Sequence, residues 1–116
     1  MLADLHMEQV GAVVVARVDG EVDMSNANEV GEAIGRQLSN DAVALVLDLT
    51  AVSYLDSAGI RIVYEIRGRL QSRGQDMRLA VGPDSPIVDA LRVAGVTVAI
   101  VTTETADAAL ASLDLG

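Results

Sequence analysis

The sequence contains no cysteine, lysine, phenylalanine or tryptophan, and it has only one histidine, two prolines and two tyrosines. Without cysteine there is no disulfide framework and no thiolate site for a metal ion. Without lysine, a Walker-type phosphate loop, Schiff-base chemistry and a receiver-domain lysine are all excluded. Any catalytic unit built on histidine would have to use His6. Two tyrosines are also too few for a protein that reads nucleic acid by stacking bases on aromatic rings.

Positive charge is scarce as well. Eight arginines stand against 17 acidic residues, so the formal net charge is −9. Affinity for nucleic acids and anionic membranes comes largely from cations that contact phosphates, so neither is an expected partner. The longest apolar run, residues 42–47, is too short to span a bilayer, and the first residues show no signal-peptide pattern. We therefore expect a soluble, cytoplasmic protein with one domain over residues 1–116 and with no cofactor or metal.

Hydrophobic periodicity predicts strands that alternate with helices along the chain. A strand pair with Gly11 between its members comes first, and an amphipathic helix capped by Ser25 or Asn26 follows. The run AVALVLDL, residues 42–49, is typical of a central strand that is covered on both faces. The predicted strands are 4–9, 12–18, 42–49, 77–81 and 98–101, and the predicted helices are 27–38, 57–72, 85–94 and a terminal one from 102. This order predicts an α/β fold with a mixed sheet of about five strands and about four helices.

Further expectations concern the loops and the helix faces. Residues 20–23 and 50–56 are expected to leave the sheet as loops. Gly31 and Gly35 weaken the first helix and would let it lie close to the sheet. The residues expected to face the core are Ala27, Val30, Ile34 and Leu38 in the first helix, Ile60, Val63, Ile66 or Arg67, and Leu70 in the second, and Ala106, Ala109, Leu110 and Leu113 in the last.

The segment from Asp48 to Gly59 carries the clearest chemical signal. It runs from the end of a buried strand, through a loop, to a helix that starts at Asp56 or Ser57. In open α/β folds, functional residues gather at the carboxyl ends of strands and beside helix N-termini. Position alone favours Ser57 as a simple helix N-cap. The alternative is a phosphorylation site, because a phosphate there could accept N–H bonds from the helix start and would add roughly −1.5 to −2 charge.

Three stretches resemble the STAS domain family of bacterial anti-sigma factor antagonists. Residues 48–63, DLTAVSYLDSAGIRIV, resemble its central signature, in which Asp-Leu-Ser/Thr ends a strand and Asp-Ser-Ser/Ala-Gly opens a helix. Residues 20–23, GEVD, and residues 91–96, LRVAGV, resemble two weaker motifs of the family. The order of elements fits over essentially the whole chain, so the resemblance implies a single STAS-like domain. Ala58 stands where many members have a second serine.

This resemblance implies a switch without enzymatic activity of its own. In the family, the unphosphorylated antagonist binds an anti-sigma factor, which is also a serine kinase, and so frees a sigma factor. The kinase phosphorylates the serine that matches Ser57, and a PP2C-type phosphatase restores it. The implied processes are transcription regulation, stress response and sporulation. The implied partner-facing residues are Asp23, Asp56, Ser57, Ala58, Gly59 and Arg61.

Several alternatives remain open at the level of sequence. A STAS-like domain can serve as a scaffold subunit of a stress-signalling assembly, or bind a nucleotide or lipid. Arg61 could contact a phosphate on Ser57 or form a surface pair with Glu65. Five arginines, Arg61, Arg67, Arg69, Arg73 and Arg78, could form a local basic patch or an ordinary solvated face. A serine hydrolase is disfavoured, because Asp56-Ser57-Ala58-Gly59 lacks the nucleophile-elbow pattern.

Overall fold

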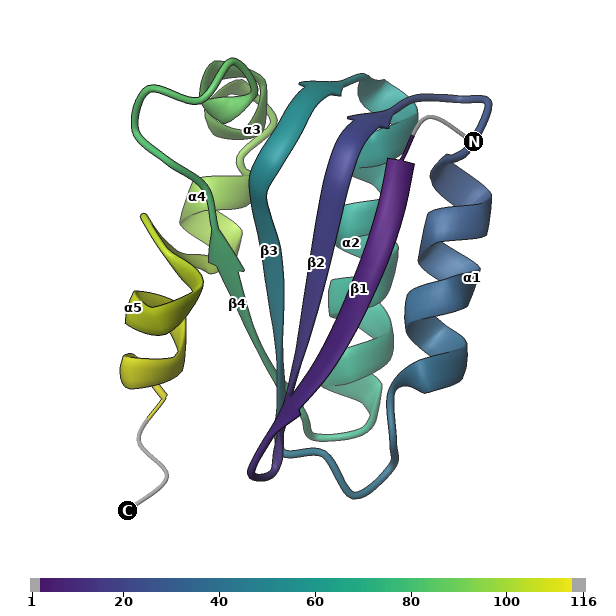
Figure 1. Cartoon of the computed structure of the whole chain (residues 1–116), viewed down its shortest axis with the longest axis vertical. Helices are drawn as coiled ribbons and strands as arrows, with labels where there is room; N and C mark the ends of the chain where they lie inside the picture. Colours follow the sequence, from purple (N-terminus) through teal and green to yellow (C-terminus); the bar gives the residue numbers. More distant parts are fainter. Residues whose placement is uncertain (1–2, 114–116) are drawn as a thin grey trace.

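The computed structural model describes residues 3–113. Within that range the chain forms five strands and five helices, with a strand pair first and alternation afterwards (Figure 1). The strands are β1 (Ala3–Val10), β2 (Val13–Val22), β3 (Ala44–Leu55), β4 (Asp76–Ala80) and β5 (Val101–Thr103). The helices are α1 (Ala27–Gln37), α2 (Ser57–Ser72), α3 (Val88–Val93), α4 (Val96–Ala99) and α5 (Ala106–Ala111).

The sheet is mixed, and its strands follow the order of the chain, β1-β2-β3-β4-β5. β1 pairs antiparallel with β2, and the three other pairings are parallel. α1 and α2 lie side by side on one face, and α5 lies on the other (Figure 1). The main core lies between the sheet and the α1–α2 layer, and a smaller cluster joins β2 and β3 to Ala109 and Leu113 at the α5 end. The predicted α/β class and mixed five-stranded sheet are therefore confirmed.

The strand pair and the first helix form as the sequence predicts. Gly11 adopts a φ of 60° in the two-residue turn between Val10 and Val13, as the first central residue of a type II′ hairpin turn requires. The predicted stripe of α1 is buried at every position: Ala27, Val30, Ile34 and Leu38. In α2 the predicted Val63, Ile66 and Leu70 are buried, but Ile62 is buried where Ile60 was expected and Ile60 is only half-buried.

The predicted loops at 20–23 and 50–56 are largely wrong, because β2 and β3 are longer than expected. Gly20 pairs with Val52, and Val22 pairs with Leu55. The two strands stay paired because register shifts after Arg17 and after Gly20 absorb the irregular spacing of the sequence. Val22 and Leu55 are buried, so the extended ends of β2 and β3 have an apolar side that packs in the core.

The end of the chain also departs from prediction. Residues 98–101 were expected as a strand, but Val96–Ala99 form the short helix α4, and β5 spans Val101–Thr103. Gly95 adopts a φ of 79° between α3 and α4, so the chain breaks and restarts a helical turn there. Val96 is then fully buried while Val98 is 92% exposed. This difference in burial between the two valines is typical of a helix and not of a strand. The terminal helix accordingly starts at Ala106 and not at 102.

The glycines of α1 allow close approach to α2 and not to the sheet. A Cβ on Gly31 would lie 3.1 Å from Cγ2 of Ile62. A Cβ on Gly35 would displace the guanidinium of Arg69, the flexible end of a long side chain. Both glycines thus make room for side chains of α2. No helix among residues 3–113 is long and apolar enough to cross a membrane.

Candidate functional site

Two loops meet at the carboxyl edge of the sheet. β2 and β3 are parallel neighbours and end together, since Val22 pairs with Leu55. The loop that leads from β2 into α1 therefore lies beside the junction of β3 and α2. The N–H of Asp56 donates to the carbonyl oxygen of Val22 at 3.3 Å, which ties the two segments together. This edge holds the residues that the sequence predicts as a site.

Asp56, and not Ser57, is the N-cap of α2. Its Oδ1 accepts hydrogen bonds from the N–H groups of Ala58 at 2.9 Å and Gly59 at 3.1 Å. Its Oδ2 accepts a bond from the N–H of Met24 at 3.2 Å, across the gap between the two loops. A carboxylate is well suited to this position, because it satisfies orphan donors at the positive end of the helix dipole. The interpretation of Ser57 as the cap is therefore wrong.

Asp23 organises the other loop. Its Oδ1 accepts bonds from both the N–H and the hydroxyl of Ser25. The side-chain hydrogen bond from Ser25, and then the backbone one, hold the pKa of Asp23 below its usual value of 3.8. Asn26, only 2% exposed, accepts from the N–H of Asp23 at 3.0 Å and donates to the carbonyl of Glu21 at 2.8 Å. The loop is thus fixed from within by one carboxylate and one buried amide.

Ser57 is the first residue of α2 and its side chain is exposed. Asp56 performs the capping, and no hydrogen bond joins the Ser57 hydroxyl to any residue in the range 3–113. Two large apolar side chains lie exposed on the same two segments, Met24 at 83% and Tyr54 at 50%. The free hydroxyl of Ser57 thus lies on the same two segments as the fixed carboxylates of Asp23 and Asp56.

Gly59 was expected at the partner-facing surface, but it is buried. A Cβ there would lie 2.3 Å from Cδ1 of Leu55 and 3.2 Å from Cγ1 of Val22. Glycine at this position lets the first turn of α2 rest directly on the ends of β2 and β3. Ala58 is half-buried, so it adds little bulk beside Ser57.

The fold and the local pattern agree with a known family. The family model described as "STAS domain" matches residues 4–109. The chain belongs to the STAS domain family.

Individual relatives support the same assignment. An anti-sigma-F factor antagonist of Mycobacterium tuberculosis, RsfB, is 35% identical over 69 residues, which are 60% of this chain and 54% of that protein. The aligned region thus spans about half of the relative. A crystal structure of an anti-sigma factor antagonist from Mycobacterium paratuberculosis superposes with a TM-score of 0.84 at 26% identity, covering 95% of this chain and 92% of that one.

A more distant neighbour shows the fold alone. The anti-sigma factor antagonist SpoIIAA in its unphosphorylated form superposes with a TM-score of 0.76 at 18% identity, over 92% of this chain and 93% of that one. The STAS-like fold expected from the sequence motifs is therefore shown. The number of helices differs, because residues 3–113 form five where about four were expected.

Arg61 of this STAS domain bonds to two other side chains and not to Ser57. Its Nη1 donates to Oε1 of Glu65 at 2.8 Å, and its Nη2 donates to Oδ1 of Asn28 at 3.2 Å. The surface pair with Glu65 is therefore the arrangement that forms. Three other arginines of the expected patch are divided between two hollows, since Arg69 faces α1 while Arg67 and Arg78 line a second cavity.

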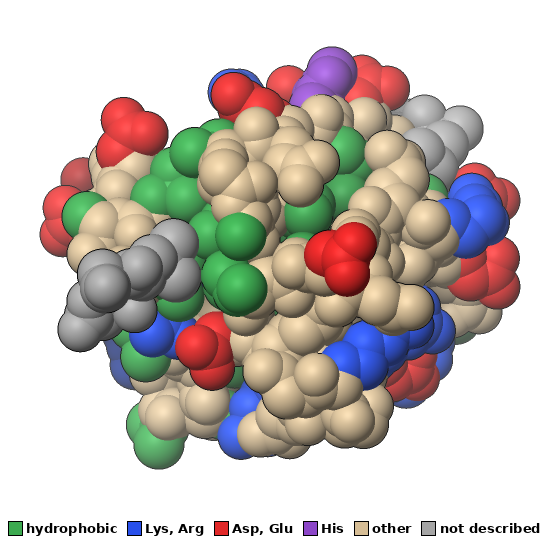
Figure 2. Space-filling model, turned by 90° about the horizontal axis from the view of Figure 1, so that it is seen from below, with side chains coloured by type: hydrophobic (Ala, Val, Ile, Leu, Met, Phe, Trp, Pro, Cys, Tyr) green, Lys and Arg blue, Asp and Glu red, His purple; other side chains and the backbone are tan. Residues whose placement is uncertain are grey.

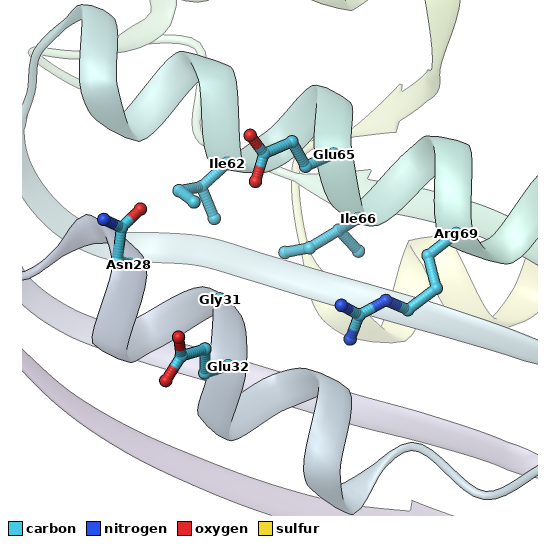
Figure 3. A pocket seen from close by; sticks show the side chains of 7 residues that line it. All are labelled: Asn28, Gly31, Glu32, Ile62, Glu65, Ile66 and Arg69. Carbon is cyan, nitrogen blue, oxygen red and sulfur yellow. The ribbon is translucent and has the colours of Figure 1, made fainter.

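A groove lies between α1 and α2 (Figure 3). Its volume is about 200 Å³, and Ile62 and Ile66 contribute its apolar lining. Glu32 and Glu65 stand on opposite helices, and Arg69 reaches from α2 toward α1 (Figure 3). Two carboxylates at the rim make the groove a poor cradle for the phosphates of a nucleotide.

Sequence reasoning found the carboxylates and Ser57 but missed Asn26 as a structural element of the site and Met24 and Tyr54 as exposed apolar groups. Asn26 was considered only as a cap, yet its side chain bonds the strand end and not the helix. Met24 carried a weak signal of an exposed apolar group, because it is a large apolar side chain inside a polar loop. Tyr54 carried none, since its segment was expected to be a loop.

Proposed function

We propose that this STAS domain is an anti-sigma factor antagonist whose binding is controlled by phosphorylation of Ser57. The unphosphorylated form binds an anti-sigma factor that is also a serine kinase, and this binding frees the sigma factor. The kinase transfers the γ-phosphoryl group of ATP to the Ser57 hydroxyl; a P–O bond forms to Oγ, ADP leaves, and the hydroxyl proton passes to a base of the kinase. A PP2C-type phosphatase reverses the modification. In this cycle the domain is a substrate and a ligand, not an enzyme.

The observation that supports the proposal is that Asp56 caps α2 while Ser57, the next residue, does not. Because Asp56 caps α2, the Ser57 hydroxyl is exposed at a helix start without a structural task. The N–H groups of Ala58 and Gly59, which a phosphate at a helix start would use, are already bonded to Asp56. A phosphate on Ser57 would then add negative charge beside Asp56 with little local compensation. The expected result is repulsion of the partner with no rearrangement of the domain.

A capture experiment with three baits tests the proposal. The baits are the wild-type chain, Ser57→Asp, and Asn40→Asp as a control that adds the same charge in an exposed turn at the opposite edge of the sheet. Wild type and Asn40→Asp should recover an ATP-dependent serine kinase from a lysate of the source organism, and Ser57→Asp should not. Equal recovery by all three baits would contradict the switch.

A second arm tests the modified residue. The captured kinase and ATP should phosphorylate wild type. They should also phosphorylate the control Ser53→Ala, which removes a different exposed hydroxyl, one on β3 that donates to the carbonyl of Gly20. Ser57→Ala should remain unmodified. If Ser57→Ala accepts phosphate as well as wild type, another residue is the acceptor.

Recovery of a megadalton-scale assembly, measured by light scattering, would favour the scaffold alternative. A melting point raised by a nucleotide or lipid would favour a small-ligand role in the α1–α2 groove.

A further inference from the structure

The two edges of the sheet differ in length and protection. β5 closes one edge with three residues, and a strand that short offers few groups for pairing. β1 closes the other edge with eight residues and contains no proline. The register shifts of the sheet lie between β2 and β3, so β1 pairs with β2 regularly from Ala3 to Val10. No strand among residues 3–113 pairs with its outer side.

The hairpin turn fixes which backbone groups of β1 face outward. A two-residue type II′ turn makes Val10 and Val13 a hydrogen-bonded pair. In an antiparallel ladder, alternate residues exchange both bonds with the partner strand, and the residues between them point their N–H and C=O groups away. Leu5, Met7 and Gln9 therefore present donors and acceptors at the free edge. This row can accept a further strand.

The side chains of β1 form two rows of different chemistry. Asp4, His6 and Glu8 are exposed and lie on one face. Leu5 and Met7 lie on the other face, half-buried against the main core beneath the helix layer. Figure 2 shows the histidine among acidic side chains at the rim of the molecule. An incoming strand would thus meet an acidic row on one face and an apolar row on the other.

The net charge of the chain disfavours a second copy as the occupant, and so does the pairing of charges in the register centred on His6. Antiparallel pairing of two β1 strands about His6 would place Asp4 of one copy opposite Glu8 of the other. Like charges directly opposite one another are destabilising in a sheet, and both molecules carry a formal charge of −9. A segment with basic side chains beside Asp4 and Glu8 and apolar side chains beside Leu5 and Met7 reverses each of these penalties.

We propose that the free edge of β1 binds an extended segment of a partner protein in which basic and apolar residues alternate. The segment adds a sixth strand to the sheet through the backbone groups of Leu5, Met7 and Gln9. The acidic row gives the interaction its preference for basic partners. The proposal uses the backbone and side chains of β1 and none of the residues around Ser57, so it stands or falls independently of the phosphorylation switch.

The probe is a capped peptide of about eight residues, matching β1 in length, in which arginine alternates with valine and threonine. A control peptide has the same composition with its arginines grouped at one end. Titration followed by amide NMR on the full chain should show the largest shifts along β1. Hydrogen exchange at Leu5, Met7 and Gln9 should slow by tenfold or more, since these N–H groups become paired. The grouped peptide should bind more weakly and leave those amides unprotected.

Two variants separate backbone pairing from charge. Gln9→Pro removes one outward N–H at an exposed position on an edge strand, where proline is tolerated, and Gln9→Ala keeps that donor. Gln9→Pro should bind the alternating peptide on the order of tenfold more weakly than Gln9→Ala. The double variant Asp4→Asn with Glu8→Gln keeps the edge intact and should lose most of the salt dependence of binding. Equal binding of both peptides, shifts outside β1, or dimers of this chain formed through β1 would each overturn the proposal.

Discussion

The two loops at the carboxyl edge of the sheet begin alike and are held differently. Each starts with an aspartate that follows a buried aliphatic residue, Asp23 after Val22 and Asp56 after Leu55. Among residues 3–113, the carboxylate of Asp23 bonds only to Ser25, two residues further along. Asp56 bonds to the first turn of its own helix and also to Met24 in the other loop. One carboxylate therefore closes a local turn, and the other joins two segments separated by more than thirty residues.

This difference shows how the site can carry a change in charge. Asp56 and the buried Asn26 fix the backbone of both loops, so neither depends on Ser57. The hydroxyl stands on a rigid support and has no bond to lose. A modification of Ser57 is thus expected to alter the surface and leave the fold in place.

The strongest test of the support is Gly59→Ala. The new Cβ would press on Leu55 and Val22, the ends of both strands. Overpacking of this kind costs about 1–3 kcal/mol, against roughly 1 kcal/mol gained by replacing glycine in a helix. Urea unfolding should therefore show a net loss of up to about 2 kcal/mol.

Gly68→Ala is the matched control, because it lies in the same helix and its Cβ would meet nothing within 4 Å. That change should stabilise the protein by about 0.5–1 kcal/mol. Equal effects of the two changes would remove the argument that Gly59 is required by close packing.

Asp56→Ala is expected to cost about 1–2 kcal/mol, because it removes the cap of α2 and the bond to Met24 together. Asp56→Asn should cost less, since an amide oxygen can still accept from Ala58 and Gly59. Amide hydrogen exchange, measured on both variants, distinguishes the capping of α2 from the bond to Met24. The Met24 amide should lose protection in both, and the Ala58 amide only in Asp56→Ala. If the Met24 amide stays protected in both, the two loops are held together by other contacts.

The sequence predicts the buried faces of the helices and strands better than the residues at which these elements begin and end. The α1 stripe from Ala27 to Leu38 and the apolar run of β3 are governed by burial, which periodicity reports directly. The extension of β3 to Leu55 depends on two register shifts at which β3 has an extra residue relative to β2, and these arise from the pairing of segments far apart in the chain. The valines near residue 98 fit strand and helix alike, and only the positive φ of Gly95 decides between them.

The site was predictable in its residue types but not in their roles. Asp-Ser at a strand-to-helix junction indicates a capped helix, yet both residues are good caps, and the choice depends on which side chain reaches Ala58 and Gly59. The bond from Met24 to Asp56 links positions 32 residues apart, so no local pattern reveals it. Likewise, the burial of Asn26 follows from its contact with the end of β2.

Asp23 offers a test that depends on pH. Its pKa is lowered by Ser25, first through the hydroxyl and then through the backbone N–H. The ionised carboxylate therefore stabilises the folded state above the unfolded pKa of about 3.9, and this contribution is lost as the pH falls through the lowered folded value. The stability difference between wild type and Asp23→Asn should be largest at neutral pH and shrink below about pH 4. In Ser25→Ala, NMR titration should find the Asp23 pKa raised toward its usual value; an unchanged pKa would remove Ser25 as the cause.

Ser57→Ala should have the smallest effect on stability and the clearest effect on modification. The hydroxyl is exposed, and Asp56 already satisfies the helix start, so the unfolding free energy should change by less than about 0.5 kcal/mol. Ser25→Ala is the contrasting variant, because its hydroxyl donates to Asp23 and its loss should destabilise the β2–α1 loop. Urea unfolding of both variants compares the two loops directly. A clear loss in Ser57→Ala would mean that Ser57 shares the structural task of Asp56, and a phosphate there would then disturb the fold as well as the surface.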